Sequence, residues 1–244
     1  MSSLKTSEDR QIARQVQRAI GDGRLFLEQE AVCNIHGPLQ TLYHEALCRM
    51  RSAQNQSVIY PNAFIPSLER LGLMRAFDRY IVRQIIETLR LQPSATLGCN
   101  VSGQSVTNDG WWDAVFDSLV VAPEVATRLV IEVTETSPIA AEQGRSFVQR
   151  FRSLGCRVAI DDLGAGYGVA NSVDVGPVDI VKIDYSLLSG VRAGKLSSAA
   201  FAGFVAAASR IAKDVVIEGV ETHQDLEVVR STDARWGQGY YYSR

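Results

Sequence analysis

Short runs of β-branched and apolar residues alternate along the 244-residue chain with longer segments of helical period. Such alternation is typical of repeated β-α units, which build a largely parallel sheet covered by helices. We expect eight strands, which start near Arg24, Thr41, Ala95, Arg128, Arg157, Val178, Asp214 and Trp236. Eight strands with intervening helices predict an α/β barrel, and a domain of this kind typically has about 250 residues.

The connections refine this prediction. Only the sequence CNIHGP separates the first two strands, so we expect them to form an antiparallel pair. Apolar residues at fourfold spacing predict helices over 11–20 and 77–91. Further helices are expected near 110–120, 138–153, 195–212 and 222–231. An open doubly wound sheet is the alternative fold, but no GxGxxG motif opens a helix after the first strand.

Composition and charge narrow the class of protein. A formal net charge of -2 argues against binding to a nucleic-acid polymer, which normally needs a basic face. The four cysteines form no CxxC pair, which favours reduced thiols in the cytoplasm over a disulfide framework or a zinc site. The polar start has no apolar signal segment, and the longest uncharged run is too short to span a bilayer.

From these features we expect one soluble, cytoplasmic domain over residues 1–244, without membrane insertion. Residues 1–10 are expected to be weakly ordered. Whether the domain is a complete protein or the cytoplasmic part of a larger one is left open by the sequence.

Side chains able to bind a cation or move a proton lie at the C-terminal end of nearly every expected strand. They are Glu45, Asn100, Glu132, Glu135, Asp161, Asp162, Lys182, Asp184, Glu218, Glu221 and Gln238. In a parallel barrel these strand ends converge on one mouth, where active sites are built. We therefore expect these side chains to lie close together.

Each of these residues also has a plain structural alternative. Asn100 could start a turn, and Glu132 and Glu135 could cap a helix. Lys182 could be a solvated strand end. However, burying so many carboxylates together without cations would cost several kcal/mol per ion. Because oxygen ligands without clustered His or Cys suit Mg²⁺ or Mn²⁺ better than zinc, the pattern predicts a divalent-metal site.

The adjacent carboxylates Asp161 and Asp162 end the apolar run RVAI and precede a glycine-rich segment. A surface turn is one explanation, since Asp and Gly are common in turns. A bound cation is the other, because it would convert the repulsion between the two carboxylates into attraction. Neighbouring side chains of a regular strand face opposite sides, so we expect the strand to end at or near Asp161. The glycines that follow would then let the backbone bend toward the metals.

The same residues carry a resemblance to the EAL-domain cyclic-di-GMP phosphodiesterases. The matching motifs, in the family's order, are EALCR from Glu45, NVS from Asn100, EVTE from Glu132, DDLGAGYG from Asp161, KID from Lys182, EGVE from Glu218 and QGYY from Gln238. The segment FIPSLERLGLM from Phe64 resembles the family's connector, and the similarity runs from about Phe26 to the C-terminus. It implies a TIM-like (β/α)8 barrel with an antiparallel first strand, and hydrolysis of cyclic di-GMP to the linear dinucleotide pGpG.

The resemblance also implies two divalent cations, Mg²⁺ or Mn²⁺. Four residues would hold the first cation: Glu45, Asn100, Glu132 and Asp161. Asp161 and Asp162 would hold the second, and Glu218 would join it or act as the base. Lys182 would orient the nucleophilic water or stabilise charge, and the choice between Glu218 and Lys182 as proton acceptor stays open.

Further roles follow from the same resemblance. Glu135 would tether the glycine-rich loop, although a helix cap is an alternative for it. Arg49 could bind a substrate phosphate with two parallel hydrogen bonds. The remaining expected substrate-binding residues are Gln29, Tyr167, Asp184 and Gln238. An ordinary packing role is an alternative for Tyr167.

Several positions depart from the family pattern. Glu30 stands where the family usually has proline, which weakens the assignment of Gln29. Leu163 replaces a common Phe and Ala165 a common Thr, and an altered loop could weaken metal occupancy or turnover. The first alternative function is a non-catalytic or weakly active cyclic-di-GMP receptor that signals through a protein partner. The second is an enolase-like lyase, against which the ordered motifs argue.

Partners are expected to be cyclic di-GMP and a second copy of the chain, since EAL-like domains often dimerise. The Ala-rich helix near 195–212 could pack in such a homodimer, and packing in the core is the alternative.

Overall fold

The computed structural model describes residues 2–38, 40–134, 138–164 and 175–242. Eight strands close into a barrel in the order β1-β9-β8-β7-β6-β5-β4-β2, and a pairing between β1 and β2 completes the ring. Their bounds are β1 Leu25–Asn34, β2 Thr41–Arg51, β4 Leu97–Ser102, β5 Leu129–Thr134, β6 Arg157–Leu163, β7 Ile180–Ile183, β8 Asp214–Ile217 and β9 Trp236–Gly237. The short strand β3 (Val58–Ile59) extends the sheet beside β2. The predicted TIM-like α/β barrel is confirmed.

The first strand runs against its neighbours. β1 pairs antiparallel with β2 and with β9, whereas the barrel pairs from β2 through β4 and on to β9 are parallel. The expected antiparallel first strand is therefore confirmed. Because the other strands run in one direction, their C-terminal ends meet at one mouth.

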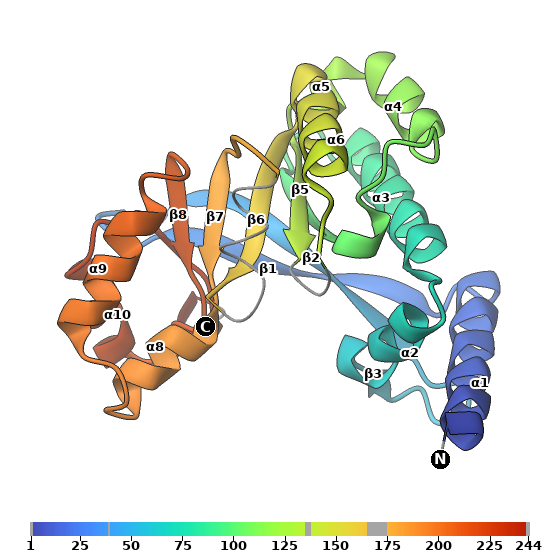
Figure 1. Cartoon of the computed structure of the whole chain (residues 1–244), viewed down its shortest axis with the longest axis horizontal. Coiled ribbons are helices and arrows are strands. Elements are labelled where there is room, and N and C mark those ends of the chain that lie inside the picture. Colours follow the sequence, from blue (N-terminus) through green and yellow to red (C-terminus); the bar gives the residue numbers. More distant parts are fainter. Residues whose placement is uncertain (1, 39, 135–137, 165–174, 243–244) are drawn as a thin grey trace.

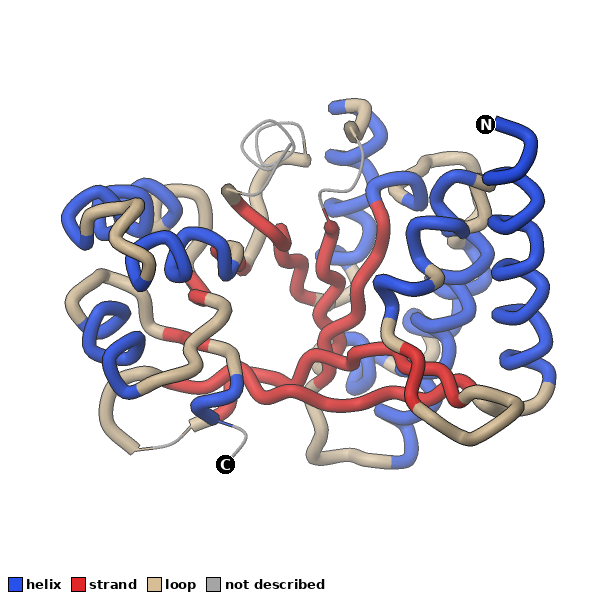
Figure 2. Tube along the Cα trace, turned by 90° about the horizontal axis from the view of Figure 1, so that it is seen from below, coloured by secondary structure: helices blue, strands red, loops and turns tan. Residues whose placement is uncertain are grey.

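Helices cover the outside of the barrel, with α8 to α10 on one side and α3 to α6 on the other (Figure 1). The tube view shows the strands lying between these two groups (Figure 2). The α-helices of the described residues are α1 Ser2–Gly21, α2 Ile65–Arg70, α3 Met74–Leu91, α4 Asp113–Val120, α5 Pro123–Ala126, α6 Ala141–Ser153, α8 Tyr185–Arg192, α9 Ser198–Ala208 and α10 His223–Arg230. None of these helices is long and apolar enough to cross a membrane.

Both ends of the chain differ from the expected elements. The helix expected over 11–20 extends over Ser2–Gly21, while the weak order expected of residues 1–10 stays a prediction. Asp9 of this helix is buried and accepts hydrogen bonds from Ser67 Oγ and Arg70 Nε of α2, each at 2.9 Å. At the other end, the expected strand WGQGYYY pairs only over Trp236–Gly237, and Tyr240–Tyr242 forms a 3-10 turn.

The interior of the barrel has two layers that alternate with the period of the strands. The lower layer is apolar and consists of Val32, Tyr43, Val130, Ala159, Ile180, Val216 and Trp236. Two positions further along the chain from the six of these residues that lie on the parallel strands stand polar residues, and side chains two apart in a strand share a face. These polar residues are Glu45, Glu132, Asp161, Lys182, Glu218 and Gln238. A buried, mainly apolar layer thus lies next to a charged one.

Gly98 on β4 makes room where the two layers meet. A Cβ at this position would collide with Glu132 Oε1 and with the ring of Tyr43. The absence of a side chain therefore allows the Tyr43 ring and the Glu132 carboxylate to share the interior of the barrel.

The turn after β4 is held by a buried carboxylate of α3. Asp78 is 3% exposed and accepts hydrogen bonds from the Ser102 backbone N–H (2.9 Å) and from Ser105 Oγ (2.6 Å). Trp112 Nε1 donates to Ser105 O at 2.8 Å and fixes the same turn from the other side. These contacts position the end of the strand that carries Asn100.

Asp78 makes stability depend on pH. Burial raises its pKa from 3.8 to about 7, whereas in the unfolded chain it titrates near its usual value. Between these values the folded state binds more protons than the unfolded state, so its contribution to stability falls as the pH rises through this window. Asp78→Asn keeps an acceptor oxygen without the charge. We expect the free energy of unfolding of the variant, relative to wild type, to rise by about 2 kcal/mol between pH 5 and pH 8 in urea titrations. A difference independent of pH would contradict this assignment.

Candidate active site at the barrel mouth

Lys182 of β7 lies at the centre of the mouth, and its side chain is completely buried. Its Nζ contacts four carboxylates, which come from the middle of β2, from β5 and β6 near their C-terminal ends, and from the residue that follows β8. The partners are Glu45 Oε2 at 2.9 Å, Glu132 Oε2 at 2.8 Å, Asp161 Oδ1 at 3.1 Å and Glu218 Oε1 at 2.8 Å. One ammonium group thus faces four carboxylates, and the cluster carries an excess of negative charge when all are ionised.

This imbalance appears in the pKa values. Burial alone would lower the pKa of Lys182, but the surrounding carboxylates raise it well above its usual value. Burial raises the pKa of Glu132 to about 8 and also raises that of Glu218. Glu45 differs because Lys182 and the hydrogen bond from Gln238 outweigh burial and lower its pKa. Additional positive charge at the mouth would favour the ionised form of every carboxylate here.

The residues present fit a divalent cation. Single oxygens of Glu45, Glu132 and Asp161 lie within 4.8 Å of one another, and so do oxygens of Asp161, Asp162 and Glu218. Asn100 Nδ2 donates to Glu45 Oε1 at 2.6 Å. Its Oδ1 and Glu132 Oε1 are buried without a hydrogen-bond partner among the described residues. Buried oxygens with unused lone pairs are suitable ligands for Mg²⁺ or Mn²⁺.

The Asp161–Asp162 pair reaches the mouth by a different backbone path from the expected one. Strand β6 does not end at Asp161 but continues to Leu163, with an irregular register between Ile160 and Leu163. Asp162 has a φ of +58°, and its N–H donates to Asp161 Oδ1 at 3.0 Å. The irregularity interrupts the alternation of faces, which is how both adjacent carboxylates take part in the acidic groups at the mouth.

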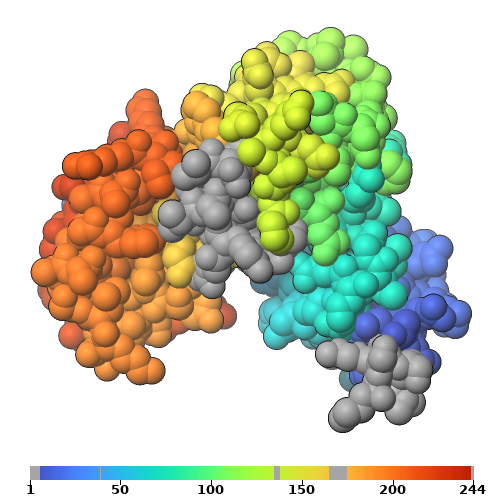
Figure 3. Space-filling view, viewed as in Figure 1, coloured from blue at the N-terminus to red at the C-terminus, as the bar shows by residue number. Residues whose placement is uncertain are grey.

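A cleft of about 510 Å³ opens beside the carboxylate cluster, and Glu218, Gln29, Arg49 and Gln238 contribute to its lining. The space-filling view shows the surface hollowed between the α8 side and the α2 side of the molecule (Figure 3). Gln238 Nε2 donates to Glu45 Oε2 at 2.7 Å, which links the cleft to the cluster. The structure therefore brings three of the expected substrate-binding residues to one cavity.

The cleft lining does not account for three other expected site residues, which are Asp184, Glu135 and Tyr167. Asp184 is buried and caps α8 by accepting a hydrogen bond from the Ser186 N–H at 2.9 Å. It is not among the cleft-lining residues of the described chain, so its role in substrate binding stays a prediction. Glu135 and Tyr167 lie outside the described residues.

The sequence analysis missed an aromatic rim. Tyr60, Tyr185 and Tyr240 are 55%, 61% and 75% exposed, and all three line the cleft. The Arg49 guanidinium lies 5.1 Å from the ring centroid of Tyr60 and also bonds Glu28 Oε2 at 2.7 Å. Only Tyr240, in QGYY, belongs to a motif that the sequence analysis noted. Exposed aromatic rings around a polar cleft are suitable platforms for nucleobases.

The fold and the site together define a TIM-type barrel with a carboxylate-rich candidate metal centre at the C-terminal ends of its strands. The chain belongs to the EAL domain family, whose model matches residues 13–244.

Individual relatives agree with this membership. The chain is 28% identical over 230 residues to cyclic di-GMP phosphodiesterase PdeF of Escherichia coli, covering 92% of the chain and 30% of the relative. It is 27% identical over 248 residues to cyclic di-GMP phosphodiesterase NbdA of Pseudomonas aeruginosa, covering 99% of the chain and 31% of the relative. The chain thus spans about a third of the length of these curated relatives.

Solved structures support the fold. An EAL domain protein from Listeria monocytogenes has a TM-score of 0.81 at 21% identity and covers 95% of this chain and 92% of its own. A complex of the PaMucR phosphodiesterase with c-di-GMP has a TM-score of 0.79 at 24% identity, with 96% of each chain covered.

Metal binding can be tested without measuring activity. A ligand that binds only the folded state at 100 times its Kd stabilises a protein by about 2.7 kcal/mol, which is roughly 5–10 °C for a chain of this size. We expect Mn²⁺ to raise the thermal midpoint by this order in differential scanning calorimetry, and Glu45→Ala to abolish most of the shift. Glu87→Ala, on the exposed outer face of α3, is the control and should keep it. An equal shift in the Glu45 and Glu87 variants would refute the ligand assignment.

Proposed function

We propose that this chain is a metal-dependent phosphodiesterase that hydrolyses cyclic di-GMP to linear pGpG and thereby lowers the level of this second messenger. The observation that carries the proposal is the convergence of Glu45, Glu132, Asp161 and Glu218 on Lys182 at the mouth of an EAL-family barrel. The names of the relatives PdeF and NbdA support this choice of substrate.

Two divalent cations, Mg²⁺ or Mn²⁺, complete the proposed site. Glu45, Asn100, Glu132 and Asp161 would hold one of them, and Asp161 and Asp162 would hold the other, with Glu218 either joining it or acting as the base. When bound, such cations neutralise the charge of a phosphodiester and lower the pKa of water.

Within the chain, Glu218 is the stronger candidate for the proton acceptor. Its side chain is 17% exposed and lines the cleft, so it can reach a water molecule next to the substrate. Lys182 Nζ is enclosed by its carboxylate partners and has no exposed surface. We assign Lys182 to holding these carboxylates in place and to supplying positive charge beneath the phosphate.

Substrate binding is assigned to the outer part of the cleft. The Arg49 guanidinium can pair with a phosphate through two charge-assisted hydrogen bonds, exchanging its exposed partner Glu28 for the substrate. The tyrosines of the aromatic rim would stack on the guanine bases. Gln29 and Gln238 offer amide groups to the same ligand.

We propose that the domain acts in the cytoplasm. Cys33, Cys48, Cys99 and Cys156 are all free thiols, which is typical of cytoplasmic proteins. The homodimer remains a prediction.

The test is incubation of purified protein with cyclic di-GMP and either Mg²⁺ or Mn²⁺, followed by chromatographic detection of the product. We expect linear pGpG to form, and chelation of the metal to stop the reaction. Tight binding of cyclic di-GMP without turnover under either metal would contradict the enzyme and favour the receptor. Failure to bind the ligand would contradict both.

Arg49→Ala tests the phosphate contact. Because a charge-assisted pair contributes about 1.5–3 kcal/mol, we expect KM for cyclic di-GMP to rise roughly 10- to 100-fold with a smaller change in kcat. Arg51→Ala is the matched control, since Arg51 lies two residues further along β2 and stacks on Phe26 at 4.5 Å. Steady-state kinetics on both variants would show equal KM values if Arg49 had no part in binding.

A further inference from the structure

Helix α8 packs against the segment that carries Glu218. Glu218 follows β8, and its N–H donates to Ile183 O at 3.1 Å. The next residue, Gly219, has a φ of +73°, and a Cβ there would lie 2.7 Å from Tyr185 Cβ at the start of α8. Only glycine allows this close approach in the left-handed conformation, so the segment rests directly on α8.

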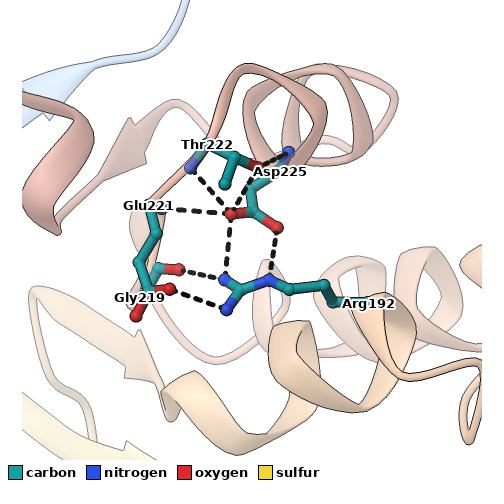
Figure 4. A network of polar contacts seen from close by, with 5 residues as sticks. All are labelled: Arg192, Gly219, Glu221, Thr222 and Asp225. Atoms are coloured by element: carbon teal, nitrogen blue, oxygen red, sulfur yellow. Dashed lines mark hydrogen bonds and ion pairs between the residues drawn. The ribbon is translucent and has the colours of Figure 1, made fainter.

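Arg192 at the end of α8 forms several hydrogen bonds to the same segment and to α10 (Figure 4). Its Nε and Nη2 donate to the two carboxylate oxygens of Asp225 at 3.0 and 2.9 Å. Nη2 also donates to Gly219 O at 3.0 Å, and Nη1 donates to Glu221 Oε2 at 2.7 Å. One guanidinium therefore joins α8, the segment after Glu218 and the first turn of α10.

Asp225 completes the arrangement from the α10 side. Its Oδ2 accepts hydrogen bonds from the backbone N–H groups of Glu221 (3.1 Å) and Thr222 (2.9 Å). Thr222 Oγ1 accepts from the Asp225 N–H at 3.1 Å, which forms a capping box at the start of α10. Asp225 is 3% exposed, so its charge is largely removed from water and relies on Arg192 as its ionic partner.

We propose that Arg192 is a positioning residue for Glu218. Arg192 fixes Gly219 O directly and, through Asp225, the N–H groups of Glu221 and Thr222. It thereby sets the backbone one residue beyond Glu218 and with it the location of the Glu218 carboxylate beside Lys182. Small displacements of a catalytic group can lower a rate by about 100-fold. The inference rests on the proposed function, in which Glu218 accepts the proton or holds a cation.

The chain offers a matched control in Arg152 at the end of α6. Arg152 Nε and Nη2 donate to the two oxygens of Asp179 at 3.2 and 3.0 Å, and its Nη1 donates to Pro177 O at 3.1 Å. The side chains of Arg192 and Arg152 are 36% and 40% exposed. Asp179 directly precedes β7 and therefore lies at the end of the barrel opposite the mouth. Arg152→Met removes a similar ion pair without touching the cleft.

The experiment compares Arg192→Met, Arg192→Lys and Arg152→Met by steady-state kinetics with cyclic di-GMP and Mn²⁺. We expect Arg192→Met to lower kcat at least 10-fold with KM changed less than threefold, and Arg192→Lys to recover part of kcat. Arg152→Met should keep the wild-type kcat even where its thermal midpoint falls as much. Equal kcat values for the two methionine variants would overturn the proposal.

Hydrogen exchange supplies a readout that does not depend on turnover. We expect the amides of Glu221 and Thr222 to exchange at least 10-fold faster in Arg192→Met than in wild type or Arg152→Met. Unchanged exchange would overturn the proposal even if the protein hydrolyses cyclic di-GMP. If the wild type shows no turnover, the proposed function fails by that result alone, while faster exchange in Arg192→Met would still support the role of Arg192 in holding the segment.

Discussion

A single buried ammonium group holds the mouth of the barrel together. Lys182 has no exposed surface and lies within 3.1 Å of four carboxylates that come from strands far apart in the sequence. Without it, those carboxylates would be buried next to one another, and removing one partner of a buried ion pair typically costs about 3–5 kcal/mol. One positive charge cannot balance the four carboxylates when all of them are ionised. This deficit makes the site chemically useful, because it creates an affinity for cations where an anionic substrate must bind.

The barrel supplies this arrangement through the two-residue period of its strands. Tyr43, Val130 and Ile180 fill the lower layer, and Glu45, Glu132 and Lys182 stand two positions further along the same strands. The apolar layer keeps water from the underside of the charges, which strengthens each electrostatic interaction at the mouth. Outside the cluster, Arg49 lines the cleft with a largely buried side chain, and the tyrosines of the aromatic rim face solvent.

Much of this could be predicted from the sequence, because a strand fixes the direction of its side chains and the motifs recur at strand ends. Glu45, Glu132, Asp161 and Lys182 were expected at one mouth and are found in contact there. The start of α1 could not be predicted, since it depends on a tertiary pairing of Asp9 with Arg70, 61 residues away. The irregularity at Asp162 was also missed, because a propensity for turns does not reveal where a strand resumes. Tyr60 and Tyr185 belong to no motif, and only the closed barrel brings them to one cleft.

The central claim is that the acidic mouth is a divalent-cation site. Anomalous diffraction from crystals grown with Mn²⁺ tests it most directly, because it locates the ion independently of any assay. The account predicts anomalous peaks at the mouth, about 2.0–2.3 Å from oxygens of Glu45, Glu132 and Asp161. Crystals saturated with Mn²⁺ that show peaks only elsewhere on the protein, with Lys182 still in contact with all four carboxylates, would contradict it.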